Sequence, residues 1–305
     1  MLNAQHRAAL DQSGKILSIA VLEGTAGSAI TDLPRVALTI NANGEIIEKS
    51  SFSTLSSTYY FALVDGEDLW INSANTVSHA TRGAVDTILV NSVTTQVGVL
   101  QGQIVGTKMF FGFINGDGGN IDLSVVDPLP KTAGNAATRI NTGGMPTQTF
   151  FAYDPTTFYT SSETLAKRIL SGTTLNSEYV FVGTNDGSLA RSIIAKSVDG
   201  NVYIFVLGDN GKIRRYRDNG SDLVEATEIV SGDATTMFCL ALTPEPTCDD
   251  SLKNQDETDV DCGGSTSCSD CEDSKACLAD SDCVNNYCNP DKICCKSCSR
   301  FVSTP

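Results

Sequence analysis

YVFVGTNDGSLARSIIAKSVDGNVYIFVLGDNGKIRRYR, from Tyr179 to Arg217, is the stretch that decides the fold. Four short runs rich in β-branched and aromatic residues alternate in it with three turns, NDG, DGN and DNG. Asn-Gly and Asp-Gly supply the positive φ angles that tight hairpin turns need. The stretch therefore predicts a meander of four antiparallel strands, at 179–184, 188–196, 202–208 and 212–217.

A similar phrase recurs upstream: an aromatic-rich apolar run, a turn and a second strand. It is found at YYFALVDGEDLWI (59–71), at MFFGFINGDGGNIDLSVV (109–126) and, more loosely, at FFAYDPTTFYT (150–160). Downstream, ATEIV and TTMFCLALT predict two further strands. Many short strands joined by hairpins are typical of a β-propeller or a β-sandwich. Blade-like meanders of about 40 to 50 residues favour a propeller of five or six blades, with the sandwich as the alternative.

Helix signals are scarce in this all-β body. The segment SSETLAKRILSG, residues 161–172, begins with serines that can cap a helix. Leu165 and Ile169 are four residues apart, and Gly172 can end a helix. We therefore expect one short helix there.

A change of composition marks a domain boundary. Residues 1–242 form the β-rich body, TPEPT (243–247) is a proline-containing linker, and 248–305 is a cysteine-rich tail. The tail has few apolar side chains, and its twelve acidic and five basic residues give it a net charge of −7. A segment so poor in apolar residues cannot build a core and needs covalent cross-links.

Charge and hydropathy exclude two classes of partner. The formal net charge of the chain is −15 and its pI is about 4.4. Such a surface repels nucleic-acid phosphates and anionic lipid. No run of about 18 apolar residues is present, so the sequence predicts no transmembrane helix.

The eleven cysteines are unevenly placed. Ten lie in the tail and predict a disulfide framework, which is typical of an oxidising compartment. They are Cys248, Cys262, Cys268, Cys271, Cys277, Cys283, Cys288, Cys294, Cys295 and Cys298. A zinc site of four thiolates, from the pairs at 268/271 and 295/298, is the alternative. The odd count leaves one thiol unpaired within the chain, and Cys239 in the body is either a small buried residue or an intermolecular bridge.

The segment CDDSLKNQDETDVDCGGSTSCSDC, residues 248–271, resembles an extracellular cysteine-rich module of algae, oomycetes, other protists and some bacteria. The matching positions are Asn254, Glu257, Thr258, Asp259, Asp261, Cys262, Gly263, Gly264, Cys268 and Cys271. The cysteines at 277, 283, 288 and 294 resemble the continuation of that module, whereas Ser251 replaces its glycine. The resemblance implies secretion and surface display. For the pairing we expect Cys277–Cys288 and Cys283–Cys294, although the spacing leaves other pairings open.

Two acidic loops are candidate calcium sites, because they place oxygen ligands two or three residues apart. The first contains Asn254, Asp256, Asp259 and Asp261, and the second contains Asn115, Asp117, Asn120 and Asp122. Turn-forming polar residues are the alternative for both loops. Asn219-Gly220-Ser221 is an acceptor sequence for N-glycosylation, in a predicted turn.

Catalytic motifs are missing from the sequence. The two histidines, His6 and His79, lie in polar segments, the second in a predicted Ser/Thr-rich loop, and no nucleophile, zinc-protease or phosphate-loop motif is present. We therefore expect no enzymatic activity. A basic cluster of Lys212, Arg214, Arg215 and Arg217 predicts either a charged edge strand that resists aggregation or a docking patch for an acidic partner.

These observations favour an extracellular structural or adhesive protein, secreted or on the cell surface. Its self-association would give a repeating subunit of a fibril, assembled head to tail. One alternative is a lectin-like protein that stacks sugars on Trp70, Tyr59 and Tyr60. Another is a secreted hydrolase with a propeller body, in which a pair of carboxyl groups with raised pKa would be expected.

Overall fold

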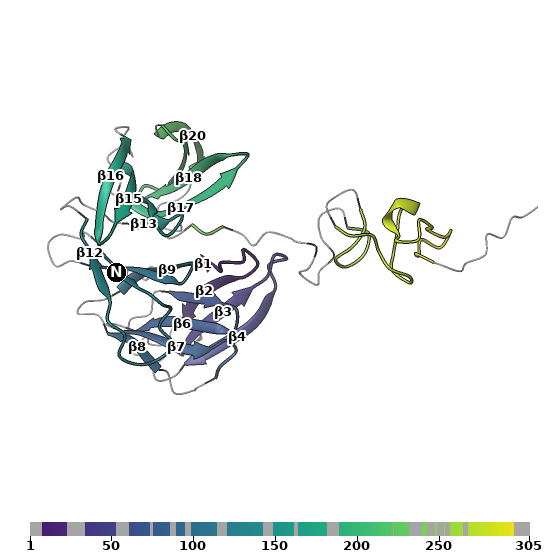
Figure 1. The fold of residues 1–305 in the computed structure, drawn as a ribbon, viewed down its shortest axis with the longest axis horizontal. Coiled ribbons are helices and arrows are strands. Elements are labelled where there is room, and N and C mark those ends of the chain that lie inside the picture. The colour runs from purple at the N-terminus through teal and green to yellow at the C-terminus, as the bar shows by residue number, and fades with distance from the viewer. Residues whose placement is uncertain are drawn as a thin grey trace, which may run out of the picture. The chain divides into compact units, whose positions relative to one another are not determined.

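The computed structural model describes most of the body and much of the tail. The described residues are 8–22, 34–52, 61–73, 76–85, 90–94, 99–114, 121–142, 149–161, 164–181, 189–221, 223–231, 240–242, 248, 253, 257–264 and 268–295. The chain divides into a body that ends at Thr243 and a C-terminal unit, Pro244–Pro305 (Figure 1). Within the described ranges no helix is long and apolar enough to cross a membrane.

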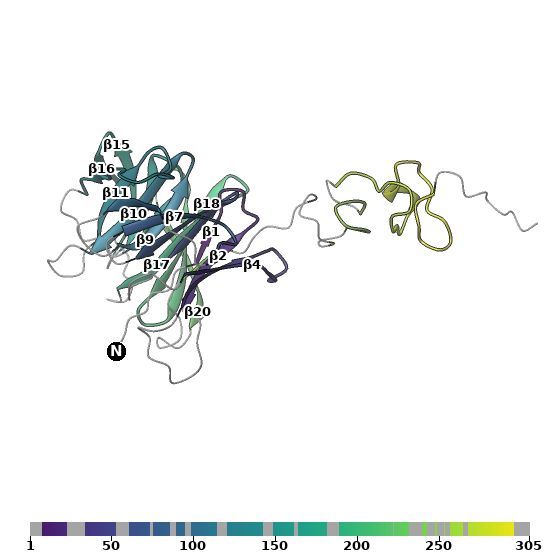
Figure 2. The same ribbon diagram turned by 90° about the horizontal axis from the view of Figure 1, so that it is seen from below.

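The body is a five-bladed β-propeller. Each blade is a four-stranded antiparallel meander whose strands follow one another in sequence order (Figures 1 and 2). Blades 1 and 2 contain β1 (Ala8–Leu10), β2 (Leu17–Leu22), β3 (Arg35–Ile40), β4 (Ile46–Phe52), β5 (Ala62–Asp65), β6 (Asp68–Ser73), β7 (Thr76–Thr81) and β8 (Val90–Thr94). Blade 3 contains β9 (Val99–Val105), β10 (Lys108–Ile114), β11 (Ile121–Val126) and β12 (Thr138–Ile140). Blades 4 and 5 contain β13 (Thr149–Ala152), β14 (Thr157–Ser161), β15 (Leu165–Ser171), β16 (Thr174–Phe181), β17 (Ala190–Val198), β18 (Asn201–Gly208), β19 (Lys212–Asp218) and β20 (Leu223–Ser231).

Hairpin turns predicted from the sequence join these strands. Asp199 and Gly200, between β17 and β18, have φ angles of 51° and 76°. Two successive positive φ values are the geometry of a two-residue turn whose twist matches that of the flanking strands. The Asp-Gly pair therefore fixes the register of this hairpin, in which Val198 lies opposite Asn201.

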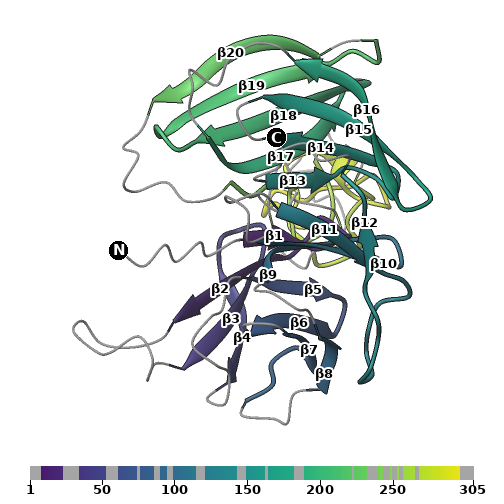
Figure 3. The same cartoon turned by 90° about the vertical axis from the view of Figure 1, so that its left-hand side faces the viewer.

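The cores lie between blades. A buried apolar cluster joins each blade to the next one along the chain, from the first to the fifth. Representative members are Phe52 with Leu69, Trp70 with Phe111, Phe110 with Phe158, and Tyr159 with Ile204. Each such aromatic side chain buries about 150–250 Å². Within the described part of the chain no buried cluster joins blade 5 to blade 1, which stand at the top and at the lower left of Figure 3.

The structure corrects three local predictions. The helix expected around Leu165 is wrong: Leu165–Ser171 is strand β15, paired with β14 and β16. Pairing on both sides overrides the weak helical signal, and Gly172, with a φ of 61°, serves the β15–β16 turn instead of ending a helix. The strand predicted at 179–184 is described only up to Phe181, and this part belongs to β16 of blade 4, so the fourth strand of the last meander is β20. His79 lies on β7, not in a loop.

The C-terminal unit has little regular structure. Its one described helical turn is the 3₁₀ segment η2 (Asp280–Asp282), and short β-bridges link Cys271 with Cys283, Ala276 with Ile293 and Cys288 with Cys294. Its core cluster consists of cysteine side chains, including the fully buried Cys271 and Cys283. Disulfides therefore take the place of apolar packing, as the composition of the tail predicts.

Candidate functional site

Four disulfides hold the described part of the tail together. They join Cys248 to Cys268, Cys262 to Cys271, Cys277 to Cys288 and Cys283 to Cys294, and the last two are the expected pairs. Cys295 is also disulfide-bonded, whereas Cys239 and Cys298 lie outside the described residues. Closing a loop of 15 residues stabilises a fold by about 3 kcal/mol in the chain-entropy account. Multiple disulfides of this kind are typical of an oxidising, extracellular-type environment.

This pairing removes the zinc alternative. Cys268 and Cys271 are in two different disulfides, and Cys295 is in a third. Zinc binds cysteine as the thiolate, and a disulfide sulfur is not a thiolate.

The segment Glu257–Gly264 contributes buried residues to the interior of the unit. Glu257 and Thr258 are buried, and the Thr258 hydroxyl lies 3.7 Å from the sulfur of Cys271. Gly263 has a φ of 72°, and a Cβ built on it would lie 2.0 Å from the Thr258 hydroxyl oxygen. Only glycine fits a position with both a positive φ and so close a neighbour.

Two carboxylates of the tail, those of Asp282 and Asp259, accept hydrogen bonds from its backbone amides. Asp282 is buried and accepts hydrogen bonds from the amides of Leu278 and Ala279 at 2.7 and 2.9 Å, and from that of Gly264 at 3.3 Å. Burial disfavours its charged form, but the amides outweigh burial and lower its pKa. Asp259 accepts from the amide of Ala276 at 2.6 Å, which also lowers its pKa.

These contacts change the interpretation of the first calcium loop. Asp259 directs its oxygens to the amides of Ala276 and Val260, and Lys275 Nζ lies 3.7 Å away. It is therefore an acceptor for the protein's own donors, and Asp261, with a φ of 58°, is a turn residue. Asn254 and Asp256 lie outside the described residues.

The second calcium loop is described only at Asp122. Its carboxylate accepts a hydrogen bond of 2.5 Å from Arg139. Asn115, Asp117 and Asn120 are outside the described residues, so the calcium prediction stays open there.

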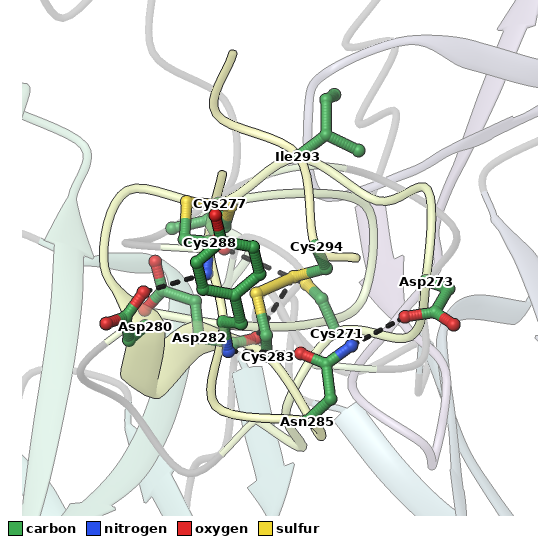
Figure 4. The surroundings of a disulfide bond; sticks show 12 residues. Cys271, Asp273, Cys277, Asp280, Asp282, Cys283, Asn285, Cys288, Ile293 and Cys294 are labelled. Atoms are coloured by element: carbon green, nitrogen blue, oxygen red, sulfur yellow. Dashed lines mark hydrogen bonds between the residues drawn. A yellow bond between two sulfur atoms is a disulfide. The ribbon is translucent and has the colours of Figure 1, made fainter. Parts of the chain in front are cut away.

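The tail exposes large apolar side chains despite having so few. Leu278 is 70% exposed and Val284 is 62% exposed, on either side of η2. Exposed carboxylates lie close to them in sequence, at Asp270, Glu272, Asp273 and Asp280. The Asn285 amide donates to Asp273 at 2.6 Å, which ties the segment after Val284 to this acidic stretch (Figure 4).

In the body, Trp70 is a core residue. It is fully buried, and its indole Nε1 donates to the carbonyl of Pro130 at 2.8 Å. It cannot stack on a sugar in this position, while Tyr59 and Tyr60 lie outside the described residues. Neighbouring His79 packs on its ring at 5.3 Å between ring centres. Of the three aromatic residues predicted to stack on sugars, Trp70 is the one that the structure describes, and its burial excludes it from that role.

Two polar networks hold the body's blades, a half-buried one around Asp68 and a buried one around Asp218. Asp68 bonds His79 at 2.7 Å and also Lys131, and although burial opposes ionisation, these partners lower its pKa. Asp218 of blade 5 accepts from the Tyr159 hydroxyl of blade 4 at 2.7 Å. Burial likewise opposes its charged form, but the Tyr159 bond and other donors lower the pKa of Asp218.

No carboxyl group in the described ranges has a resolved pKa above its usual value. Each resolved carboxyl shift is downward, at Asp68, Asp154, Asp218, Asp259 and Asp282. A general acid needs the opposite shift. Sequence reasoning missed the roles of Asp218 and Asp282. Asp218 gains Tyr159 from a distant strand, and Asp282 combines the nearby amides of Leu278 and Ala279 with the more distant amide of Gly264.

The basic cluster lies on an interior strand, so the edge-strand interpretation is wrong. β19 pairs with β18 on one side and β20 on the other. Lys212 Nζ and Arg214 bind Glu228 at 3.2 and 4.0 Å. Arg215 lies over the ring of Tyr203, 5.4 Å from its centre. Strand alternation thus separates the four cations onto two faces of blade 5.

The glycosylation acceptor is accessible. Asn219 is exposed in the turn between β19 and β20, where its side-chain oxygen accepts from the amide of Ser221 at 3.0 Å. This local turn orders the acceptor sequence at the surface.

No protein family and no curated protein matches the sequence. Among solved structures, the chain is similar to a luciferin-regenerating enzyme, with a TM-score of 0.50 and 9% identity over 73% of this chain and 74% of that chain. It is also similar to the RRP9 WD40 repeats (TM-score 0.49, 10% identity, 78% and 69% covered) and to the Pseudomonas aeruginosa periplasmic gluconolactonase PpgL (0.46, 16%, 74% and 72%). The chain spans 61% of the matched chain in an S. cerevisiae structure of Dbp5 bound to Nup159. At 9% identity, the similarity to the luciferin-regenerating enzyme concerns the fold alone.

Proposed function

We propose that this chain is a non-enzymatic extracellular structural or adhesive protein that self-associates into a fibril. The tail unit carries the proposal. It is built from disulfides, which suit an oxidising compartment, and it exposes Leu278 and Val284. The tail has few apolar side chains, so the exposure of these two suits contact with another chain.

The body offers apolar surface of its own. Ile46 and Ile47, on the outer strand β4, are 60% and 47% exposed. A contact between two different surfaces of identical subunits is heterologous, and it generates a filament when its rotation does not close a ring. Tail-to-body contacts would therefore assemble copies head to tail.

Electron microscopy of native, non-reduced protein, with matched reducing and non-reducing gels, tests the proposal. We expect regular fibrils in which each repeat contains one propeller. A gel ladder that disappears on reduction would add an intermolecular bridge, for which Cys239 is the candidate, and Cys239→Ser is its control. Monodisperse monomers across the concentration range would refute the proposal.

A further inference from the structure

A lysine and two carboxylates meet where blade 4 packs against blade 5. Lys167 lies on β15, Glu178 lies on β16, and Asp218 is the last residue of β19. The Nζ atom of Lys167 lies 3.0 Å from Asp218 Oδ2 and 3.3 Å from Glu178 Oε2. We call these three residues the lysine cluster.

The contact between Lys167 and Asp218 is shielded from solvent. Their side chains are 14% and 3% exposed, which makes this the most buried of the lysine–carboxylate pairs in the described part of the chain. A site that excludes water strengthens its own electrostatic interactions and suppresses hydrolysis. The amine and the carboxyl group are therefore held in contact with little water to compete for either.

Donors hold both oxygens of Asp218. Oδ2, the oxygen in contact with Lys167, accepts a hydrogen bond from the Tyr159 hydroxyl at 2.7 Å. Oδ1 accepts from the amide of Gly220 at 2.8 Å. Donors aimed at a carbonyl oxygen stabilise the negative charge that develops there when a nucleophile adds to the carbon. The two oxygens thus have different surroundings: an amide donor holds Oδ1, and the lysine protons lie next to Oδ2.

The lysine cluster is ionised, although burial favours its neutral form. Burial lowers the pKa of Lys167 and raises that of Asp218, but the contact between the two groups and their other hydrogen bonds oppose burial and prevail. Transfer of one proton along the 3.0 Å contact gives an amine and a carboxylic acid without changing the net charge of the pair. An amine and a carboxylic acid are the nucleophile and the electrophile of an amide bond.

We propose that Lys167 and Asp218 condense to an isopeptide bond that joins blade 4 to blade 5. The Nζ atom attacks Cγ of Asp218, so that a C–N bond forms and the bond from Cγ to Oδ2 breaks. Oδ2 leaves as water with two of the three ammonium protons, and the third proton stays on the amide nitrogen. No oxidant or other co-reactant is needed. Well-oriented groups in one molecule react as if at about 10⁵–10⁸ M, which favours condensation of two groups already in contact.

This bond goes beyond the proposed function and does not depend on self-association. It would fix two consecutive blades to each other, as suits a structural protein. Unlike the disulfides of the tail, it would survive exposure to thiols.

Peptide mapping of the full-length protein by tandem mass spectrometry tests the bond. Trypsin does not cleave after an acylated lysine. We therefore expect one branched peptide that contains both Lys167 and Asp218 and is one water lighter than its two linear parts. Lys167→Arg keeps the positive charge but cannot form the bond, so it should give linear peptides of the encoded mass. Unmodified linear peptides from wild type, with cleavage after Lys167, would overturn the proposal and leave an ion pair only.

A second lysine–carboxylate pair serves as an internal control. Lys212 and Glu228 are 3.2 Å apart, but their side chains are 34% and 39% exposed, so they should stay linear in the same digest. A branched peptide at this exposed pair as well would mean that such bonds form during handling, which overturns the proposal. A loss of water that persists in Lys167→Arg overturns it too, since ring closure of Asp218 with its own backbone also releases water. The wild-type map is decisive even where the variant folds poorly.

Discussion

Replacing Gly263 by alanine should destabilise the tail without affecting the propeller. Alanine at a φ of 72° costs about 1–2 kcal/mol, because its Cβ crowds the backbone in the left-handed region. The new methyl group would also lie 2.0 Å from the Thr258 hydroxyl oxygen and 3.1 Å from the Cys271 sulfur. Relief of such overpacking costs a further 1–3 kcal/mol or so. We expect a loss of about 3 kcal/mol in the tail.

Hydrogen exchange measured by mass spectrometry checks this value on oxidised protein. A loss of about 3 kcal/mol lowers protection of residues 257–294 by about 150-fold and leaves the propeller amides unchanged. Gly134→Ala is the control for backbone strain alone, since Gly134 has a φ of 85° and no atom within 4 Å of the added Cβ.

The steric part of the cost can be isolated by a double-mutant cycle. Thr258→Ala removes the hydroxyl oxygen that the new Cβ would meet, so the double variant should lose less than the sum of the two single variants. The reasoning would be refuted if the double variant lost as much as the two single variants together. It would also be refuted if Gly263→Ala cost no more than Gly134→Ala.

Three further predictions concern the networks. Asp259 and Asp282 have lowered pKa values in the folded tail, so their stabilisation is present above the unfolded pKa of about 3.9 and is lost as the pH falls through the folded values. Hydrogen exchange at stepwise lower pH, corrected for intrinsic rates, should show tail protection lost there. Trp70→Phe removes the donor to the Pro130 carbonyl and should lower the free energy of unfolding of the body by about 1–3 kcal/mol, as measured in urea. Reducing agent should release the tail's protection while the propeller's fluorescence-monitored unfolding midpoint stays constant.

The sequence predicts where the strands lie along the chain better than it predicts which strands pair with each other. Alternation and turn residues locate β17, β18 and β19 to within about two residues, because these signals are local. Sheet membership depends on pairing with strands distant in sequence. The local signals therefore place the segment at Tyr179 in the wrong meander and predict an edge position for β19, which the observed pairing corrects. The helix expected around Leu165 failed for the same reason: spacing by four fits a helix, and only strand pairing excludes it.

In the tail, the sequence predicts the disulfide-built unit but not the role of its carboxylates. Cysteine density predicted a disulfide-built unit, because a segment without apolar residues has few other means of folding. Acidic residues two or three apart were interpreted as metal ligands, yet Asp259 accepts hydrogen bonds from Val260 and Ala276. Carboxylates that bind cations and carboxylates that bind amides look alike in sequence, since both need only oxygen at a turn.

The two units hold themselves together by different chemistry, and this bears on how copies could join. The propeller is held by aromatic clusters between blades and does not depend on the redox state of the described cysteines, all of which lie in the tail. The tail is held by disulfides and by buried Asp282, so it keeps its form only where thiols are oxidised. A connector of this kind would become competent to bind only in an oxidising compartment, after synthesis.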